Sequence, residues 1–380
     1  MALRSKLPDV GVTIFTVMSK LAQDTGAINL SQGFPDFQPH PELVGLVNRY
    51  MRDGFNQYAP MQGAVGLRRN IAEKVGALYG AEVDPDIEIT VTAGATEALF
   101  ASVAAVVHPG DEVILLEPAF DAYEPAVRLS GGVPVLVPLT FPDYRVDWER
   151  VKGAVTNRTR MLIINSPHNP TGTLLKVEDI RALQGIVSDQ GLFILSDEVY
   201  EHILFDGRAH ESMMRYPDLA ERSFVISSFG KTYHATGWKV GYCIAPVPLS
   251  GEFRKIHQYL TFCVNTPIQH ALAEFMRQKE HYLNLRAFYQ QKRDFFLGLL
   301  ARSRFRPLAC EGTYFLMADY SAISDEPDTV FVMRLTREYG VAMIPPSVFY
   351  HDRLDNKVVR LCFAKQEETL ERAAERLCRI

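Results

Sequence analysis

Residues 87–107 read IEITVTAGATEALFASVAAVV. Ile87, Ile89 and Val91 alternate with polar residues, which is typical of a β-strand. The Gly-Ala-Thr turn at 94–96 then opens an apolar stretch that is long enough for a helix from about Ala95 to Val107. A strand followed directly by a helix is the unit from which parallel sheets are built.

The same alternation continues on both sides of this segment. A helical pattern at 64–80 precedes it, and another occupies 177–187. Further short strand candidates are apolar throughout, and they lie at 113–116, 133–137, 161–164, 193–195, 224–227 and 240–244. Strands of this kind, alternating with helices, predict an α/β fold with a mostly parallel sheet covered by helices on both faces.

The pattern changes after Pro248. Two long helical patterns cover about 250–278 and 281–302, and strand candidates follow at 314–318, 341–344 and 358–363. We interpret this part as a second, smaller α/β domain. The first 40 residues are too few for a domain, and we expect them to pack on it.

The composition favours a globular protein of the cytoplasm. A net charge of -5 gives no sign of a nucleic-acid partner, and the longest apolar stretch, at 98–107, is too short to span a membrane. The N-terminus has no secretory signal pattern. The cysteines are odd in number and widely spaced, so we expect reduced thiols rather than disulfides or a metal site; they are Cys243, Cys263, Cys310, Cys362 and Cys378.

Small and polar residues follow the strand candidates at their carboxyl ends, where the sites of open α/β sheets lie. Residues 92–96 lead into a helix and let backbone N–H groups approach an anion, although an ordinary strand-to-helix turn has the same pattern. Residues 165–172 form a loop stiffened by two prolines, with Asn165 and Asn169 placed where a ligand can lie.

Two further loops carry ionisable groups. Asp197 and Tyr200 follow the strand at 193–195, where Asp197 either meets a cation or caps a helix. Lys231 lies in the sequence Ser-Phe-Gly-Lys-Thr at 228–232. This is not a phosphate-binding P-loop, because position 225 is valine where that motif needs glycine. An apolar, aromatic setting would lower the pKa of Lys231 and suit imine chemistry, whereas a surface lysine would have no such role.

Together these loops offer an anion site, a carboxylate, a phenol, amides and a reactive lysine. Pyridoxal 5'-phosphate needs this set, because its aldehyde requires a lysine and its ring nitrogen a carboxylate. Motifs of competing enzyme classes, such as GxGxxG, GxSxG and HExxH, do not occur in the sequence. We predict pyridoxal 5'-phosphate as the cofactor and no metal.

The chain resembles the class I/II aminotransferases of fold type I. The motifs that carry the resemblance are Asn-Gln-Tyr at 56–58, Ala-Gly-Ala-Thr-Glu-Ala at 93–98, Asn-Pro-Thr-Gly at 169–172, Ser-Asp-Glu-Val-Tyr at 196–200, Ser-Phe-Gly-Lys-Thr at 228–232, Gly-Trp-Lys-Val-Gly at 237–241 and Arg-Leu-Cys-Phe at 360–363. Residues 31–37, Ser-Gln-Gly-Phe-Pro-Asp-Phe, are similar to the branch that includes bacterial methionine aminotransferases and kynurenine aminotransferases. The expected organisation is a large cofactor-binding domain at 45–280 and a small domain formed by 1–44 and 281–380.

The resemblance implies how the cofactor is held. Lys231 would form the internal aldimine and shuttle a proton, Asp197 would pair with the ring nitrogen, and Tyr200 with Asn169 would bind the phenolic oxygen. Phe120 would stack on the ring. The residues that would hold the phosphate are Ala95, Thr96, Ser228 and Lys239, with Tyr58 from the partner subunit of a homodimer with shared sites. Many relatives have arginine at the position of Lys239. Lysine keeps the positive charge but lacks the bidentate fork of arginine.

The resemblance also implies the substrates and the reaction. Arg360, helped by Asn169 and Gly33, would bind the α-carboxylate of an amino acid, and the reaction would be a ping-pong transamination with a 2-oxo acid. Two alternatives remain open: a cysteine-conjugate β-lyase that uses the same site, and a non-enzymatic regulator. A regulator of this kind carries a DNA-binding domain, and only about 30 residues, not notably basic, precede the first shared motif.

Aromatic residues near the motifs predict the preferred side chain. Phe15, Phe34, Phe120, Tyr123 and Tyr314 fall close to the expected site, with Tyr58 and Phe262 offered by the partner, and no second arginine for a distal carboxylate is evident. We therefore expect methionine and aromatic amino acids, including kynurenine, to be better donors than aspartate.

Overall fold

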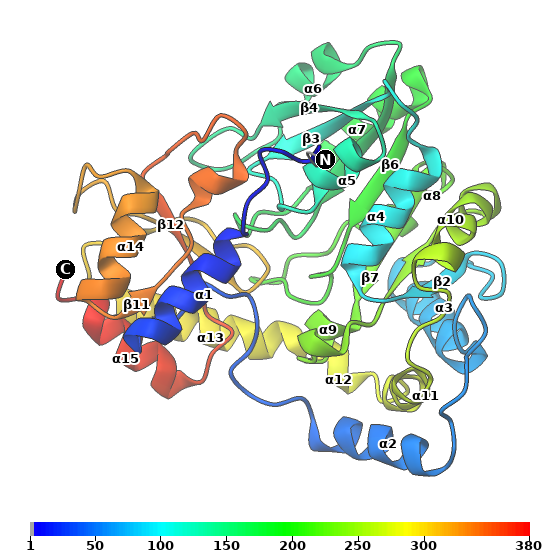
Figure 1. The fold of residues 1–380 in the computed structure, drawn as a ribbon, viewed down its shortest axis with the longest axis horizontal. Helices are drawn as coiled ribbons and strands as arrows, with labels where there is room; N and C mark the ends of the chain where they lie inside the picture. Colours follow the sequence, from blue (N-terminus) through cyan, green and yellow to red (C-terminus); the bar gives the residue numbers. More distant parts are fainter. Residues whose placement is uncertain (1–3) are drawn as a thin grey trace.

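The computed structural model describes residues 4–380, and its larger part is built on one seven-stranded sheet (Figure 1). The strands follow the order β2-β8-β7-β6-β5-β3-β4. They are β2 (Ile89–Thr92), β3 (Glu112–Glu117), β4 (Val133–Pro138), β5 (Thr159–Asn165), β6 (Phe193–Asp197), β7 (Ser223–Ser228) and β8 (Gly241–Ile244). Only β8 runs antiparallel to its neighbours, so the predicted mostly parallel sheet is confirmed.

Helices cover both faces of this sheet because its central strands are apolar on both sides. Ile114 and Leu162 belong to one buried cluster, whereas their neighbours Val113 and Met161 belong to another. The helices of the first cluster include α3 (Val65–Tyr79), α6 (Trp148–Ala154), α7 (Val177–Gln190) and α8 (Pro217–Ala220). Those of the second are α4 (Ala95–Val106), α5 (Tyr123–Leu129) and α10 (Val247–Leu260).

A smaller second part contains two further sheets. The antiparallel sheet has the order β12-β10-β9, and the parallel pair joins β1 to β11. These strands are β1 (Ile28–Asn29), β9 (Arg306–Pro307), β10 (Phe315–Asp319), β11 (Val341–Ala342) and β12 (Val358–Cys362). The helices beside them are α1 (Ile14–Thr25), α13 (Leu285–Leu300), α14 (Asp328–Glu338) and α15 (Glu367–Leu377).

The N-terminal segment joins this second part. Ile28–Asn29 pairs with Val341–Ala342, and Figure 1 shows α1 beside α14. The next helix, α2 (Pro41–Arg52), packs instead against α11 (Thr266–Phe275), which lies with the larger part. The domain limits at residues 45 and 280 stay a prediction.

Each of the two long helical patterns after Pro248 is divided in the structure. The first becomes α10 and α11, because Phe262 has a φ of 67° and Asn265 starts a new helix by accepting a hydrogen bond from the backbone N–H of Ile268 at 3.1 Å. The second becomes α12 (Glu280–Leu283) and α13. The remaining helices are α9 (Phe229–Thr232) and the 3-10 turns Met213–Arg215, Thr236–Trp238 and Pro346–Phe349.

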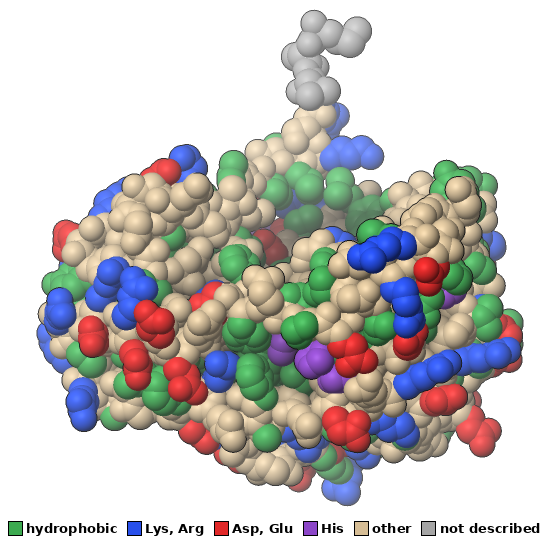
Figure 2. All heavy atoms as spheres, turned by 90° about the horizontal axis from the view of Figure 1, so that it is seen from below, with side chains coloured by type: hydrophobic (Ala, Val, Ile, Leu, Met, Phe, Trp, Pro, Cys, Tyr) green, Lys and Arg blue, Asp and Glu red, His purple; other side chains and the backbone are tan. Residues whose placement is uncertain are grey.

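The surface carries charged side chains of both signs. Figure 2 shows them interspersed over one face, with a hollow beneath the N-terminal segment. No helix within residues 4–380 combines the length and the apolar composition that a membrane span requires.

Candidate active site

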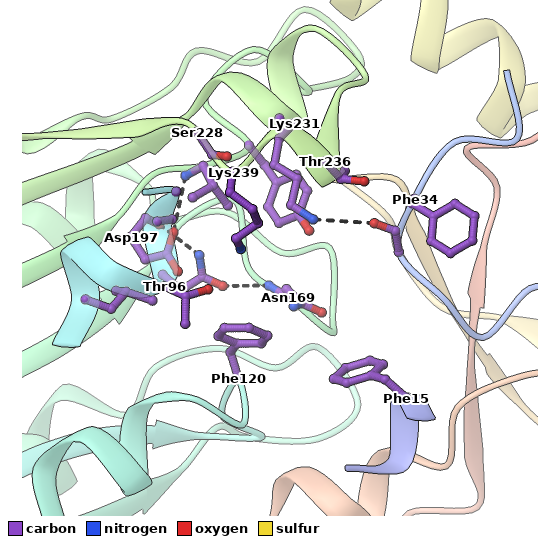
Figure 3. Close-up of a pocket in the computed structure, with 18 of the residues that line it drawn as sticks. Phe15, Phe34, Thr96, Phe120, Asn169, Asp197, Ser228, Lys231, Thr236 and Lys239 are labelled. Carbon is purple, nitrogen blue, oxygen red and sulfur yellow. Dashed lines mark hydrogen bonds between the residues drawn. The ribbon is translucent and has the colours of Figure 1, made fainter. Parts of the chain in front are cut away.

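A cavity of about 370 Å³ opens at the carboxyl ends of the parallel strands (Figure 3). All of the predicted site residues except Tyr58 line it. Those that do are Phe15, Gly33, Ala95, Thr96, Phe120, Asn169, Asp197, Tyr200, Ser228, Lys231, Lys239 and Arg360. Lys231 and Lys239 point into the cavity from one side, and Phe15 and Phe120 lie on the opposite side. The structure therefore brings together residues that are up to 345 positions apart in the chain.

One end of the cavity is built for an anion. Helix α4 begins at Ala95 without a side-chain cap, so its first backbone N–H groups lack the partner that most helices provide. Lys239 adds a positive charge there, since a Cβ atom placed on Gly94 would lie only 3.3 Å from its Nζ. Thr96 and Ser228 supply hydroxyl groups at the cavity wall. The N–H groups, the hydroxyls and the ammonium form a donor set that fits a phosphate dianion.

Asp197 ends strand β6 and is 4% exposed. Its carboxylate accepts hydrogen bonds from Tyr123 Oη at 2.7 Å and from the backbone N–H of Val199 at 3.3 Å. Burial nevertheless raises its pKa to about 6. Within residues 4–380 this carboxylate forms no salt bridge, so a cationic ligand atom would relieve a buried charge.

Lys231 projects from helix α9, directly after strand β7. Its Nζ donates to Tyr314 Oη at 3.0 Å and lies 3.4 Å from the carbonyl oxygen of Gly33. The rings of Tyr200 and Tyr314 are each 5.6 Å from Nζ, which confirms the predicted aromatic setting. Burial lowers the pKa of Lys231 to about 8, so a sizeable fraction of the amine is unprotonated and nucleophilic near neutral pH.

Arg360 lies on strand β12 and is fully buried. Its Nη1 donates to Asn169 Oδ1 at 2.8 Å and its Nη2 donates to the carbonyl oxygen of Ser31 at 2.8 Å. The ring of Phe315 packs 3.9 Å from Cζ, and Nε has no hydrogen-bond partner. Burial lowers the pKa of this guanidinium to about 10. A buried cation with an unused donor fits a ligand carboxylate.

The rest of the lining is mainly apolar. Phe15, Leu99, Phe120 and Phe315 line the cavity, and Phe34 borders it with its ring turned away from Lys231. The cationic lining residues among the described part of the chain are Lys231, Lys239 and Arg360, so the wall offers no further arginine for a second substrate carboxylate.

Three contacts could not be read from the motifs. Tyr123 binds Asp197 and Tyr314 binds Lys231, whereas the sequence indicates only that both tyrosines are aromatic neighbours of the site. Asn165 shapes the loop, because its Nδ2 donates to the carbonyl oxygen of Asp197 at 2.8 Å and its Oδ1 accepts from the N–H of Asn169 at 2.7 Å. The one feature of the sequence that indicated a role for Asn165 is its position at the carboxyl end of β5.

Tyr58 lies outside the cavity of its own subunit. Its side chain is 82% exposed and its ring meets the ring of Phe262 edge-on at 5.3 Å. Its reach into a partner subunit stays a prediction.

The family model named "Aminotransferase class I and II" matches residues 25–377, nearly the whole chain. The chain belongs to the class I and II aminotransferases. It is therefore an enzyme that transfers amino groups between small amino and keto acids, as the motif resemblance implied.

Individual members of the family agree with this assignment. A methionine aminotransferase of Escherichia coli is 54% identical over 98% of this chain and 97% of its own. A kynurenine–oxoglutarate transaminase of Dictyostelium discoideum is 35% identical over 97% of this chain and 94% of its own. The crystal structure of an Escherichia coli methionine aminotransferase superposes with a TM-score of 0.98 at 53% identity, covering 100% of both chains.

The aminotransferase family implies pyridoxal 5'-phosphate as cofactor, and the site residues fit this group. The uncapped start of α4 with Lys239 suits its phosphate, and Asp197 suits a protonated ring nitrogen. Lys231 supplies an amine of lowered pKa in the same cavity.

Proposed function

We propose that this aminotransferase uses pyridoxal 5'-phosphate to exchange amino groups between methionine or aromatic amino acids, kynurenine among them, and a 2-oxo acid in a ping-pong cycle. The observation that carries the proposal is the meeting of Lys231, Asp197 and Arg360 in one cavity with an apolar wall. Asp197 and Arg360 are buried and Lys231 is partly buried, and each lacks a full set of compensating partners of its own.

When bound, pyridoxal 5'-phosphate supplies an electrophilic aldehyde and a ring that accepts the electron pair released at the substrate α-carbon. Lys239, Ser228 and the N–H groups of Ala95 and Thr96 would hold the phosphate. Asp197 would keep a proton on the ring nitrogen by accepting its hydrogen bond. Tyr200 and Asn169 would hold the phenolic oxygen, and Phe120 would pack against the ring.

Arg360 and Lys231 act on the substrate. Each Nη atom of Arg360 keeps one N–H beyond its hydrogen bond to Asn169 or Ser31, so the guanidinium would bind the α-carboxylate and orient the amino acid. Gly33 borders the same position. Lys231 Nζ, with its pKa lowered by burial, would act as the base that accepts the proton from the substrate α-carbon and as the acid that later gives this proton up.

The apolar wall selects the side chain of the donor. Burying an apolar side chain contributes about 25 cal/mol per Å², and a thioether or aromatic ring packs well against Phe15 and Phe120. A second carboxylate would enter without a cation to pair with. The similarity to methionine and kynurenine aminotransferases supports this preference.

The active unit is proposed to be a homodimer. Tyr58 and Phe262 are exposed and in ring contact, and Tyr259 is 85% exposed nearby in the sequence. Exposed aromatic residues of this kind are typical of a protein–protein interface. Tyr58 would then reach the phosphate in the partner subunit.

Steady-state kinetics with methionine, phenylalanine, kynurenine and aspartate against a panel of 2-oxo acids test the proposal. We expect kcat/KM for methionine to exceed that for aspartate by at least roughly tenfold, since each 1.4 kcal/mol of lost side-chain binding is a factor of ten. Lys231→Ala is the control and should remove turnover of every donor.

Aspartate as the best donor would contradict the apolar selection. Release of pyruvate and ammonia from cysteine conjugates without a 2-oxo acid would identify the β-lyase reaction instead.

A further inference from the structure

Tyr314 touches the reacting end of Lys231 from a distant part of the chain. Its phenol oxygen lies 3.0 Å from Lys231 Nζ, although the two residues are 83 positions apart. The same hydroxyl donates to the carbonyl oxygen of Gly33 at 2.7 Å. Lys231 Nζ is 3.4 Å from that carbonyl, so the three groups form a closed triangle.

The direction of these hydrogen bonds is set by the chemistry of the groups. A phenol has one proton, and the carbonyl of Gly33 can only accept, so the proton of Tyr314 is used on Gly33. The phenol oxygen is then an acceptor for Lys231 Nζ. Burial raises the pKa of Tyr314 well above its usual value, which keeps the phenol protonated and this direction fixed.

The phenol is held rigidly. Tyr314 is 0% exposed, and its ring meets that of Tyr200 edge-on at 5.2 Å. Its carbonyl oxygen accepts from the N–H of Phe363 at 3.0 Å, next to strand β12. A rigid acceptor restricts the positions that the flexible lysine side chain can occupy.

The backbone at Gly33 is also fixed from this side. A Cβ atom on Gly33 would lie 2.6 Å from Cζ of Phe315, so only glycine allows the backbone to come so close to residues 314–315. Two residues earlier, the carbonyl of Ser31 accepts from Arg360. We call residues 31–34 the substrate strap, because Gly33 and Phe34 line the cavity and Ser31 binds the proposed carboxylate-binding arginine.

We propose that Tyr314 is a positioning residue. Its one phenol hydroxyl fixes the position of Lys231 Nζ relative to the substrate strap. The inference rests on the proposed role of Lys231 as the amine that moves the α-proton. Tyr314 acts through Lys231 and Gly33, and it does not line the cavity.

The hydroxyl also affects the charge of Lys231. An acceptor that faces Nζ favours the ammonium form, so removing it lowers the pKa of Lys231. The titratable and charged groups that act on Nζ from the surrounding elements are Asp197, Tyr200, Lys239, Tyr314, Arg360 and Cys362. Of these, Tyr314 is the one that Nζ reaches with a hydrogen bond.

The chain offers a matched control. Tyr289 is also 0% exposed, and its ring centroid is 5.7 Å from that of Tyr314, but its hydroxyl has no hydrogen-bond partner. Tyr289→Phe and Tyr314→Phe therefore each remove one buried oxygen from the same aromatic cluster. Only Tyr314→Phe removes a contact with Lys231.

The test measures the pKa of Lys231 without turnover. Full-length wild type and both variants, in the cofactor-free form, are labelled with trinitrobenzenesulfonate over a range of pH, and the label on Lys231 is quantified by peptide mass spectrometry. We expect the pKa of Lys231 to fall by about one unit in Tyr314→Phe, because the ammonium loses the phenol oxygen as an acceptor and the carbonyl oxygen of Gly33 replaces it only in part. Tyr289→Phe should follow the wild type.

Kinetics of the cofactor-loaded enzymes supply the second readout. We expect kcat for methionine to fall about tenfold or more in Tyr314→Phe, with a displaced pH profile, while Tyr289→Phe keeps both. Circular dichroism and thermal unfolding verify that all three proteins fold alike.

Equal Lys231 pKa values in the two variants would overturn the role of Tyr314 and leave the aminotransferase proposal intact. A shifted pKa together with a wild type that transfers no amino group from methionine would leave the Tyr314 contact standing and contradict the proposed donor.

Discussion

Two buried carboxylates lie four residues apart, one at the end of strand β6 and one just after it, and their surroundings differ. Asp197 and Glu201 are each 4% exposed. Glu201 receives Lys74 Nζ at 2.6 Å, Ser227 Oγ at 2.6 Å and the hydroxyl groups of Tyr79 and Tyr242. Despite burial, Lys74 holds the pKa of Glu201 well below its usual range. Asp197 receives one phenol and one backbone N–H, and its pKa rises to about 6.

The different number of hydrogen-bond and charge partners distinguishes a structural carboxylate, Glu201, from a reactive one, Asp197. The charge of Glu201 is compensated by the chain itself, which anchors the segment to helix α3 and strands β7 and β8. Glu198 is similarly held by His210 Nε2 at 2.8 Å and by Ser196 Oγ at 2.9 Å. The charge of Asp197 is left for a ligand, and a perturbed group in a cavity marks a functional site.

Replacement of the uncompensated carboxylate should have the largest effect on turnover. Asp197→Asn keeps the shape of the side chain but cannot hold a proton on the ring nitrogen. We expect kcat for methionine to fall about a thousandfold, or roughly 4 kcal/mol of transition-state stabilisation, while circular dichroism shows a native fold. Unchanged turnover in this variant would make Asp197 as structural as Glu201.

Replacement of the compensating cation should act on stability instead. Lys74→Met leaves Glu201 buried without its partner, and we expect the free energy of unfolding to fall by about 3–5 kcal/mol in urea titrations. The kcat of the folded variant should change less than tenfold. The double variant Lys74→Met/Glu201→Gln, which buries no lone charge, should recover part of the stability.

If Lys74→Met lost as much turnover as Asp197→Asn, Glu201 would also be needed for catalysis, and the contrast between a structural and a reactive carboxylate would be wrong.

The smallest effect concerns stability and pH. Burial raises the pKa of Asp197 in the folded state to about 6 from its usual value of 3.8. The group therefore stabilises the fold fully below pH 3.8 and loses this contribution as the pH rises through 6. Between pH 5 and 8 the cofactor-free wild type should lose about 1.4 kcal/mol of unfolding free energy relative to Asp197→Asn. Urea unfolding of both proteins at the two pH values measures this difference, and an equal change in both would show that the pKa of Asp197 is not raised.

The strands and the loops that follow them could be predicted from the sequence because apolar runs and the residues after them are local signals. Asp197, Asn169 and Lys231 were found in this way. The sequence also contains a signal for the break between α10 and α11, because Asn265 and Pro267 are typical of a helix start. The prediction missed this break because the apolar pattern continues on both sides of it.

Contacts between distant side chains were not readable. Lys74 looks like any lysine on an amphipathic helix, and its partner Glu201 lies 127 positions later. The contacts of Tyr123 and Tyr314 likewise depend on the folded chain, because neither position has a local signal that distinguishes it from a core aromatic residue. Such pairs follow from the three-dimensional arrangement of loops, which periodicity does not encode.

The hydrogen bond from Arg360 to Ser31 joins residues 329 positions apart, and its companion to Asn169 spans 191 positions. We expect contacts across such separations to form late in folding, because closing long loops costs entropy before any contact compensates it. During synthesis, the Ser31 and Asn169 acceptors are made long before the arginine that joins them. The proposed carboxylate-binding site is therefore complete only in the fully folded chain. Amino-acid binding should stabilise that state and leave partly folded chains unaffected.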